Sequence, residues 1–175
     1  NAAAKVEYLC DCVKYKRCIF ASHPADCIVM CIEADKPGMI NLEARFSRPE
    51  RAYNGVDRIG SDTVLMHGDL GKRGYDFAMA LRAVSNGGSV RQLGEYLVVE
   101  NADKVWLYIT SDCTYHCKDE LNRLLKENKS DNGVTGECGA VLESNIALGL
   151  LKKRIGDILD ASADKGYEEL FKEHV

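Results

Sequence analysis

Apolar residues in the first two thirds of the chain recur at every second position or in short β-branched and aromatic runs. Such alternation is the signature of β-strands, and turn residues such as Lys36-Pro37-Gly38 separate the runs. The pattern predicts strands at 6–13, 16–22, 27–34, 39–47, 63–68, 75–84, 89–93, 96–100 and 104–110. So many short strands in so little chain favour an antiparallel β-sandwich.

Turn chemistry and alternation also predict how some strands are arranged. Asn86-Gly87-Gly88 predicts a short hairpin, and Gly94-Glu95 predicts another tight connection. Cys10 and Cys12 are expected on the same face of one strand. Alternation along the strand at 75–84 places four large side chains on one face, which we expect to enter the core: Tyr75, Phe77, Met79 and Leu81.

The last third of the chain has helical spacing instead. Leucines within 119–128 predict a short amphipathic helix, and the polar, Gly-containing stretch 129–139 predicts a loop or a disordered insertion. From 144 to 174 apolar residues again follow helical spacing, with a break at Lys165-Gly166. The predicted fold is therefore mainly β, an antiparallel β-sandwich followed by C-terminal linker helices.

These elements divide the chain into four parts. We expect a leader at 1–5, whose first two residues we interpret as a remnant of a cloning vector. A β-sandwich at 6–115 follows, then a helix and loop at 116–143 that form an insertion. Linker helices at 144–175 complete the division.

Charge excludes two classes of partner. The chain has 23 Lys and Arg against 27 Asp and Glu, for a net charge of −4. Such a balance produces no field that would attract a phosphate backbone or an anionic membrane. No apolar run approaches the roughly 20 residues that span a bilayer. We therefore expect neither nucleic acid nor membrane as a partner.

Eight cysteines raise the question of disulfides: Cys10, Cys12, Cys18, Cys27, Cys31, Cys113, Cys117 and Cys138. Most lie inside apolar runs, where a free thiol behaves as a small buried hydrophobe. A chain of 175 residues has core enough to fold without disulfide staples. We interpret the thiols as mostly reduced, which favours a cytoplasmic location.

One cysteine-rich stretch is a candidate metal site. Cys113, His116 and Cys117 lie within five residues, and Cys138 is a further candidate ligand. Structural zinc sites usually have two paired Cys-x2-4-Cys knuckles, and only one loose pair is present here. We therefore favour strand-end residues over zinc, and predict no metal or cofactor.

Catalytic motifs are weak. Ser22 and His23 are adjacent, whereas a nucleophile needs a base that reaches it from elsewhere, and a turn at Pro24 explains the pair. Glycines at 68–74 lack the helix and Lys-Ser/Thr pair of a phosphate-binding loop. His67 and His174 belong to no recognisable catalytic motif. The residues thus predict a scaffold with no catalytic residue.

Short motifs nevertheless follow one another along the chain: Tyr15-x-Arg17-x-x-Phe20-Ala21-Ser22-x-Pro24-x-Asp26-x-Ile28-Val29, Ala34 to Gly38, Gly68, Gly71, Gly74 with Phe77, Gly87-Gly88, Ala102-Asp103 with Trp106-Leu107-Tyr108, and Thr114-Tyr115. This succession resembles the N-terminal β-domain of glycoside hydrolase family 95. The stretch from Lys165 to Val175 is similar to the family's linker to its (α/α)6 catalytic barrel. Cys18 departs from the family, where a charged residue is usual, and the family's opening strands are missing.

The resemblance implies a parent enzyme that cleaves α-L-fucosyl or α-L-galactosyl linkages with inversion. The family's acid and base lie in the barrel, which we expect after Val175, so none can be placed on this chain. The segment is then a non-catalytic scaffold that packs on that barrel and meets fucosylated oligosaccharides only through the parent. An incomplete sandwich should leave strand edges uncovered, so we expect the isolated segment to be inactive and to self-associate.

Two other functions remain open from the sequence. A β-sandwich can work alone as a carbohydrate-binding module, which requires exposed aromatic rings. A thiol-dependent or metal-dependent regulator rests only on the number of cysteines. Calorimetric titration with fucosylated oligosaccharides and metal analysis distinguish these functions from a scaffold.

Overall fold

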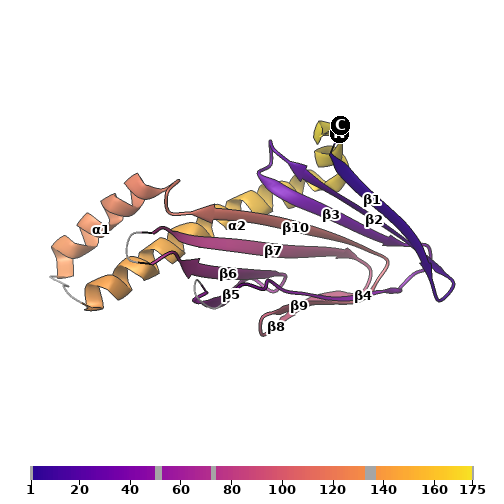
Figure 1. Ribbon diagram of the computed structural model, residues 1–175, viewed down its shortest axis with the longest axis horizontal. Coiled ribbons are helices and arrows are strands. Elements are labelled where there is room, and N and C mark those ends of the chain that lie inside the picture. The colour runs from indigo at the N-terminus through magenta and orange to yellow at the C-terminus, as the bar shows by residue number, and fades with distance from the viewer. Residues whose placement is uncertain (1, 50–52, 72–73, 133–136, 175) are drawn as a thin grey trace.

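A computed structural model of the chain describes residues 2–49, 53–71, 74–132 and 137–174 (Figure 1). These residues form ten strands and two helices. The elements are β1 (Ala3–Cys10), β2 (Val13–Ser22), β3 (Cys27–Ala34), β4 (Ile40–Ala44), β5 (Gly55–Ile59), β6 (Thr63–Asp69), β7 (Asp76–Asn86), β8 (Ser89–Leu93), β9 (Tyr96–Ala102), β10 (Lys104–Cys113), α1 (Lys118–Asn132) and α2 (Glu137–His174). Neither helix has a stretch long and apolar enough to span a membrane in these described ranges.

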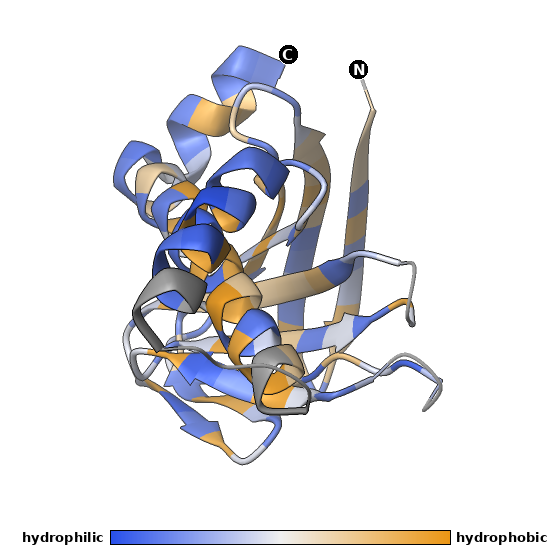
Figure 2. Cartoon of the chain, turned by 90° about the vertical axis from the view of Figure 1, so that its left-hand side faces the viewer, coloured by the Kyte–Doolittle hydropathy of each residue, from blue (hydrophilic) through white to orange (hydrophobic). Residues whose placement is uncertain are grey.

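The strands form two antiparallel sheets. The large sheet has seven strands in the order β1-β2-β3-β10-β7-β6-β5, and the small sheet has three in the order β4-β9-β8. The small sheet packs on one face of the large sheet, and α2 runs across the opposite face (Figures 1 and 2). The expected fold class, mainly antiparallel β in a sandwich with C-terminal helices, is confirmed.

Alternation along β10 divides the core into two apolar clusters. Val105 and Leu107 face the small sheet and belong to the inter-sheet cluster. Trp106 and Tyr108 point the other way, into the helix-side cluster that α2 covers. The sheet's central strands are therefore buried on both faces.

Strand β7 is buried on both faces for the same reason. We expected only the face of Tyr75, Phe77, Met79 and Leu81 to enter the core. Ala78 and Ala80, on the opposite face, have no exposed area because α2 lies against them. Tyr75 instead lies before β7 and is 44% exposed.

Helix α2 has two parts. Gly166 has φ 74° and ψ 163°, a conformation essentially restricted to glycine, and it breaks the helix where the sequence predicts a break. Before Gly166, apolar residues such as Leu151 and Ile155 pack on the large sheet. After it, Tyr167 and Phe171 pack edge-on against Phe20 of β2. Both helical parts thus bury the helix-side cluster.

The stretch 129–139, which we expected to be a loop or a disordered insertion, is helical at both of its ends. Helix α1 continues to Asn132 and α2 begins at Glu137, while 133–136 lie outside the described residues. Polar residues without apolar periodicity give no helix signal, so these helix ends are not evident from the sequence.

Two turns differ from the prediction. Asp11 and Cys12 have φ of 50° and 59° and close a hairpin between β1 and β2, so Cys12 is in a turn and not on a strand face with Cys10. Gly87 and Gly88 do not close a hairpin. They carry the chain from β7 in the large sheet to β8 in the small one.

Two further differences concern the start of the first strand and a strand that the sequence did not predict. Strand β1 begins at Ala3, so Ala3 to Lys5 of the expected leader pair with β2. Strand β5, which pairs with β6, was not predicted at all. Its sequence, Gly-Val-Asp-Arg-Ile, has too few apolar residues to show a strand pattern.

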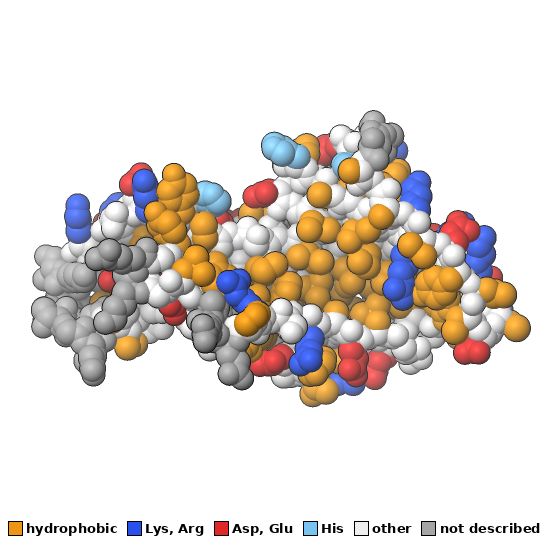
Figure 3. All heavy atoms as spheres, in the orientation of Figure 1, with side chains coloured by type: hydrophobic (Ala, Val, Ile, Leu, Met, Phe, Trp, Pro, Cys, Tyr) orange, Lys and Arg blue, Asp and Glu red, His pale blue; other side chains and the backbone are white. Residues whose placement is uncertain are grey.

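The small sheet leaves part of the large sheet uncovered. Ile28 of β3 is 40% exposed, and its register partner Ile109 of β10 is partly exposed. With Ala21 and Met79 they line a hollow of about 320 Å³. Hydrophobic side chains gather in the middle of this side of the molecule (Figure 3). We call this surface the open apolar face.

Candidate functional site

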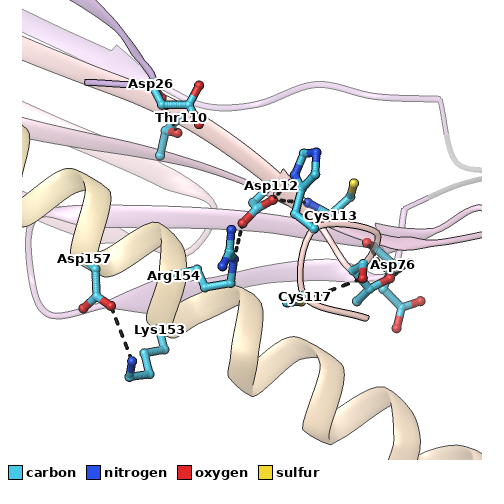
Figure 4. A network of polar contacts seen from close by, with 11 residues as sticks. Asp26, Asp76, Thr110, Asp112, Cys113, Cys117, Lys153, Arg154 and Asp157 are labelled. Atoms are coloured by element: carbon cyan, nitrogen blue, oxygen red, sulfur yellow. Dashed lines mark hydrogen bonds and ion pairs between the residues drawn. The ribbon is translucent and has the colours of Figure 1, made fainter. Parts of the chain in front are cut away.

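A buried carboxylate lies where β10 ends. Asp112 follows Tyr108 and Thr110 on the face that meets α2, and its side chain is 4% exposed. Its Oδ2 accepts a hydrogen bond from Nε of Arg154 at 2.6 Å. Its Oδ1 lies 2.7 Å from Nδ1 of His116 and accepts from the backbone N–H of Cys113 at 2.8 Å (Figure 4). The Asp112 network therefore ties the sheet, the turn after it and α2 together.

Charge pairing keeps Asp112 ionised. Burial by itself would raise the pKa of Asp112, but hydrogen bonds from Arg154 and His116 outweigh it and hold the pKa below its ordinary value. Both carboxylate oxygens already have partners. The arrangement is that of a structural ion pair.

The candidate metal ligands are only partly brought together. Atoms of Asp112, Cys113 and His116 that can ligate a metal lie within 4.8 Å of one another, and Asp112 was not among the candidates from the sequence. The Cys117 thiol instead lies buried against the carbonyl oxygen of Thr114, 3.9 Å away. The Cys138 side chain lies outside the described residues. A cation held by these atoms would lie next to the Arg154 guanidinium, which already pairs with Asp112, so the site suits a metal poorly.

A polar hollow lies beside this network, between the β6–β7 connection, the turn after β10 and the two helices. It encloses about 560 Å³, and its lining includes Tyr75, Asp76, Lys118 and Asn122. Tyr75 of this lining packs edge-on against Tyr115, with ring centroids 5.3 Å apart. The two rings are 44% and 52% exposed, respectively. Exposed aromatic rings beside carboxylate and amide groups are the chemistry that sugar rings contact.

Two acidic residues of the hollow have pKa values that are shifted in opposite directions. Asp69 and Asp76 are direct partners across β6 and β7. Hydrogen bonds from Asn54 and from the backbone of Gly71 lower the pKa of Asp69. Burial, with the nearby charges of Asp69 and Glu143, raises the pKa of Asp76. The Asp69 side chain thus accepts hydrogen bonds from its own loop and from Asn54, whereas the Asp76 side chain accepts none from the residues that the structure describes.

The remaining candidates from the sequence lie apart. Ser22 is buried and His23 lies in the turn after β2. His67 lies 3.7 Å from Asp57, and the His174 ring packs on Phe20. None of these forms the nucleophile and base arrangement of a hydrolase.

Comparison with known proteins identifies the chain. Residues 1–118 match the model of the glycosyl hydrolase family 65 N-terminal domain. The chain belongs to this family. The expected resemblance to an N-terminal glycoside hydrolase domain is thereby confirmed, with family 65 as the family that matches.

Relatives of this family 65 N-terminal domain are much longer. The chain is 30% identical over 139 residues to alpha-L-fucosidase 2 of Arabidopsis thaliana, a match that includes 66% of this chain and 16% of the relative. Among solved structures, a putative kojibiose phosphorylase from human microbiome matches with a TM-score of 0.43 and 13% identity. That match covers 90% of this chain and 22% of the other.

Proposed function

We propose that the chain is the non-catalytic N-terminal scaffold of a larger glycoside hydrolase, and that this parent is an inverting α-L-fucosidase or α-L-galactosidase of the family 95 type. The match of residues 1–118 to an N-terminal glycosyl hydrolase domain carries the proposal. The similarity to alpha-L-fucosidase 2 supports the substrate class, an α-L-fucoside. In such a parent the general acid and the base that activates water belong to the (α/α)6 barrel.

The open apolar face supports a packing role. It continues the inter-sheet cluster, since Ile109 packs on that cluster while remaining partly exposed. An apolar patch continuous with a core is typical of a surface that another part of the same protein covers. We propose that the rest of the parent covers this face.

Activity assays test the scaffold. The chain should release no L-fucose from a fucosylated oligosaccharide, and the same chain extended by the parent's catalytic region should release it. Fucose released by the chain alone would overturn the proposal. In the extended protein, Ile28→Asp should weaken the packing of the open apolar face against the rest of the parent and lower the thermal stability of the protein. Leu9→Asp, on the β1–β2 hairpin, should leave the thermal stability unchanged.

A second function, a carbohydrate-binding module, is favoured by one observation: Tyr75, which lines the polar hollow, and Tyr115, which packs against Tyr75, are both exposed. Calorimetric titration of the chain with fucosylated oligosaccharides tests it. Micromolar binding that Tyr115→Ala abolishes, and that Tyr8→Ala on β1 leaves unchanged, would favour the module over the scaffold. An absence of heat with the unmodified chain would exclude it.

A further inference from the structure

Two cysteines face each other across β2 and β3. Cys18 and Cys31 are direct partners in the antiparallel register. Directly opposed residues have Cα atoms about 4.5–5.5 Å apart and point to the same face of the sheet, which is within the range of about 4.4–6.8 Å for disulfides. The register therefore places the two cysteines at a Cα separation that suits a disulfide.

This pairing is particular to Cys18 and Cys31 among the described cysteines. Cys27 lies opposite Ser22, Cys113 lies opposite Phe77, and Cys10 lies opposite Val13. Cys12 is in a turn, and the Cys117 thiol is buried against a carbonyl oxygen. Only Cys18 and Cys31 are in direct register in the part of the chain that the structure describes.

A reagent in solution can reach the pair. Both cysteines line a hollow of about 240 Å³ that also includes Lys5, Lys16 and Arg17. Cys18 is partly exposed in this hollow, whereas Cys31 is 3% exposed. The cationic side chains suit an anionic reagent, although Glu7 and Glu33 in the same lining offset part of their charge.

The two thiols are not equivalent as nucleophiles. Burial raises the pKa of Cys31 to about 12, so Cys31 stays a thiol at neutral pH. Since the thiolate is the attacking form and Cys18 is the more accessible, Cys18 is the residue that attacks first. Tyr167 of α2 lines the same hollow as Cys18.

We propose that Cys18 and Cys31 form a reversible dithiol site that reacts with anionic low-molecular-weight disulfides. The Cys18 thiolate attacks one sulfur of the small disulfide, a mixed disulfide forms, and one small thiolate leaves. Cys31 then loses its proton and attacks the Cys18 sulfur, which releases the second small thiolate. The chain loses two electrons and two protons, and the small disulfide becomes two thiols. This site goes beyond the proposed scaffold role.

Peptide mapping with oxidised glutathione tests the site. Proteolytic cleavage before Asp11, Asp26 and Asp35 gives one peptide that contains Cys12 and Cys18 and a second that contains Cys27 and Cys31. In a Cys12→Ala/Cys27→Ala background, Cys18 and Cys31 are the only cysteines in the two peptides. After oxidation and alkylation the two peptides should be linked, with the loss of both thiols, and dithiothreitol should separate them again.

The partner variants identify the order of attack. Adding Cys31→Ala to that background should abolish the link and leave glutathione attached to Cys18. Adding Cys18→Ala should leave Cys31 unmodified. The proposal is overturned if both thiols are recovered alkylated and unlinked after oxidation, or if glutathione accumulates on Cys31. Thermal unfolding of each variant before oxidation shows that it is folded.

Discussion

Arg154 of α2 donates through Nε to the carboxylate of Asp112 at the end of β10, and the two atoms are 2.6 Å apart. The two residues are 42 positions apart in the chain and join the helix to the centre of the large sheet. Asp112 is nearly inaccessible to water, whereas Arg154 is partly exposed. Loss of the guanidinium would leave a buried carboxylate with reduced compensation, which is costly.

Replacing Arg154 by methionine should therefore lower the free energy of unfolding by about 2 kcal/mol, less than a fully buried pair because Arg154 is partly exposed. Lys153→Met is the matched control, since the exposed Lys153–Asp157 pair should contribute less than about 0.5 kcal/mol. Methionine, lysine and arginine have similar helix propensities, so a change in helix propensity contributes little to the stability of either variant. Urea unfolding followed by circular dichroism measures the free energy of unfolding of the two variants. Equal losses in Arg154→Met and Lys153→Met would contradict a structural role for the Asp112 network.

Asp76 gives a prediction for pH. Its folded pKa lies above the ordinary value of 3.8, so the folded state holds its proton more tightly than the unfolded state. Ionised Asp76 therefore lowers the free energy of unfolding at pH values above its raised pKa. This destabilisation disappears as the pH falls below 3.8, where Asp76 is protonated in both the folded and the unfolded state. Asp76→Asn should stabilise the chain by about 0.5 kcal/mol at pH 7, because it removes like charges that face each other across two strands.

The control for Asp76 is its cross-strand neighbour. Asp69 accepts hydrogen bonds from Asn54 and Gly71, so Asp69→Asn should destabilise the chain at pH 7. Thermal unfolding of both variants between about pH 3 and pH 7 shows whether each substitution raises or lowers the stability of the chain. The same sign for both variants at pH 7 would show that the two carboxylates do not differ as described.

Gly88 should tolerate no side chain. It has φ 64°, and a Cβ atom there would lie 2.1 Å from the carbonyl oxygen of Glu100. Gly88→Ala should cost about 3 kcal/mol or more, since backbone strain and a clash with backbone atoms combine. Gly94 has a similar φ of 59° with nothing within 4 Å, so Gly94→Ala should cost only about 1 kcal/mol. Denaturant unfolding of the Gly88→Ala and Gly94→Ala variants separates the effect of the steric clash from that of backbone strain. An equal loss of stability in both variants would contradict the close approach of the Glu100 carbonyl oxygen to Gly88.

The open apolar face should cause self-association of the isolated chain. Ile28 lies in this face and is 40% exposed, so Ile28→Asp should shift the chain toward monomer. Leu9 is even more exposed, at 73%, but lies near the β1–β2 turn, so Leu9→Asp should leave association unchanged. Light scattering over a range of concentrations measures the molar mass. An unmodified chain that stays monomeric at high concentration would refute the expectation.

The sequence predicts much of the fold because alternation and helical spacing are local. Nine of the strands and the break at Gly166 follow from such patterns. Strand β5 does not, because its pairing with β6 and not its own composition makes it a strand. Asp11 and Cys12 form a tight turn without the glycine or asparagine that usually marks one.

The candidate sites were harder to predict, because they depend on how distant elements meet. The Asp112 and Arg154 pair requires the position of α2 on the large sheet, which periodicity does not specify. The glycines at 87 and 88 predict a turn correctly, yet do not say that the next strand belongs to another sheet. The pairing of Cys18 with Cys31 depends on strand register, although a hairpin turn near Pro24 would have suggested it.

The two-sided burial of β10 has a consequence for how substitutions combine. Leu107 and Tyr108 are neighbours in sequence, but their side chains lie in clusters separated by the thickness of one backbone layer. Tyr108 and Leu159 are distant in sequence but share a cluster. Thermodynamic coupling in this domain should therefore follow layers: adjacent β10 residues should contribute almost independently, whereas residues of β10 and α2 should be non-additive.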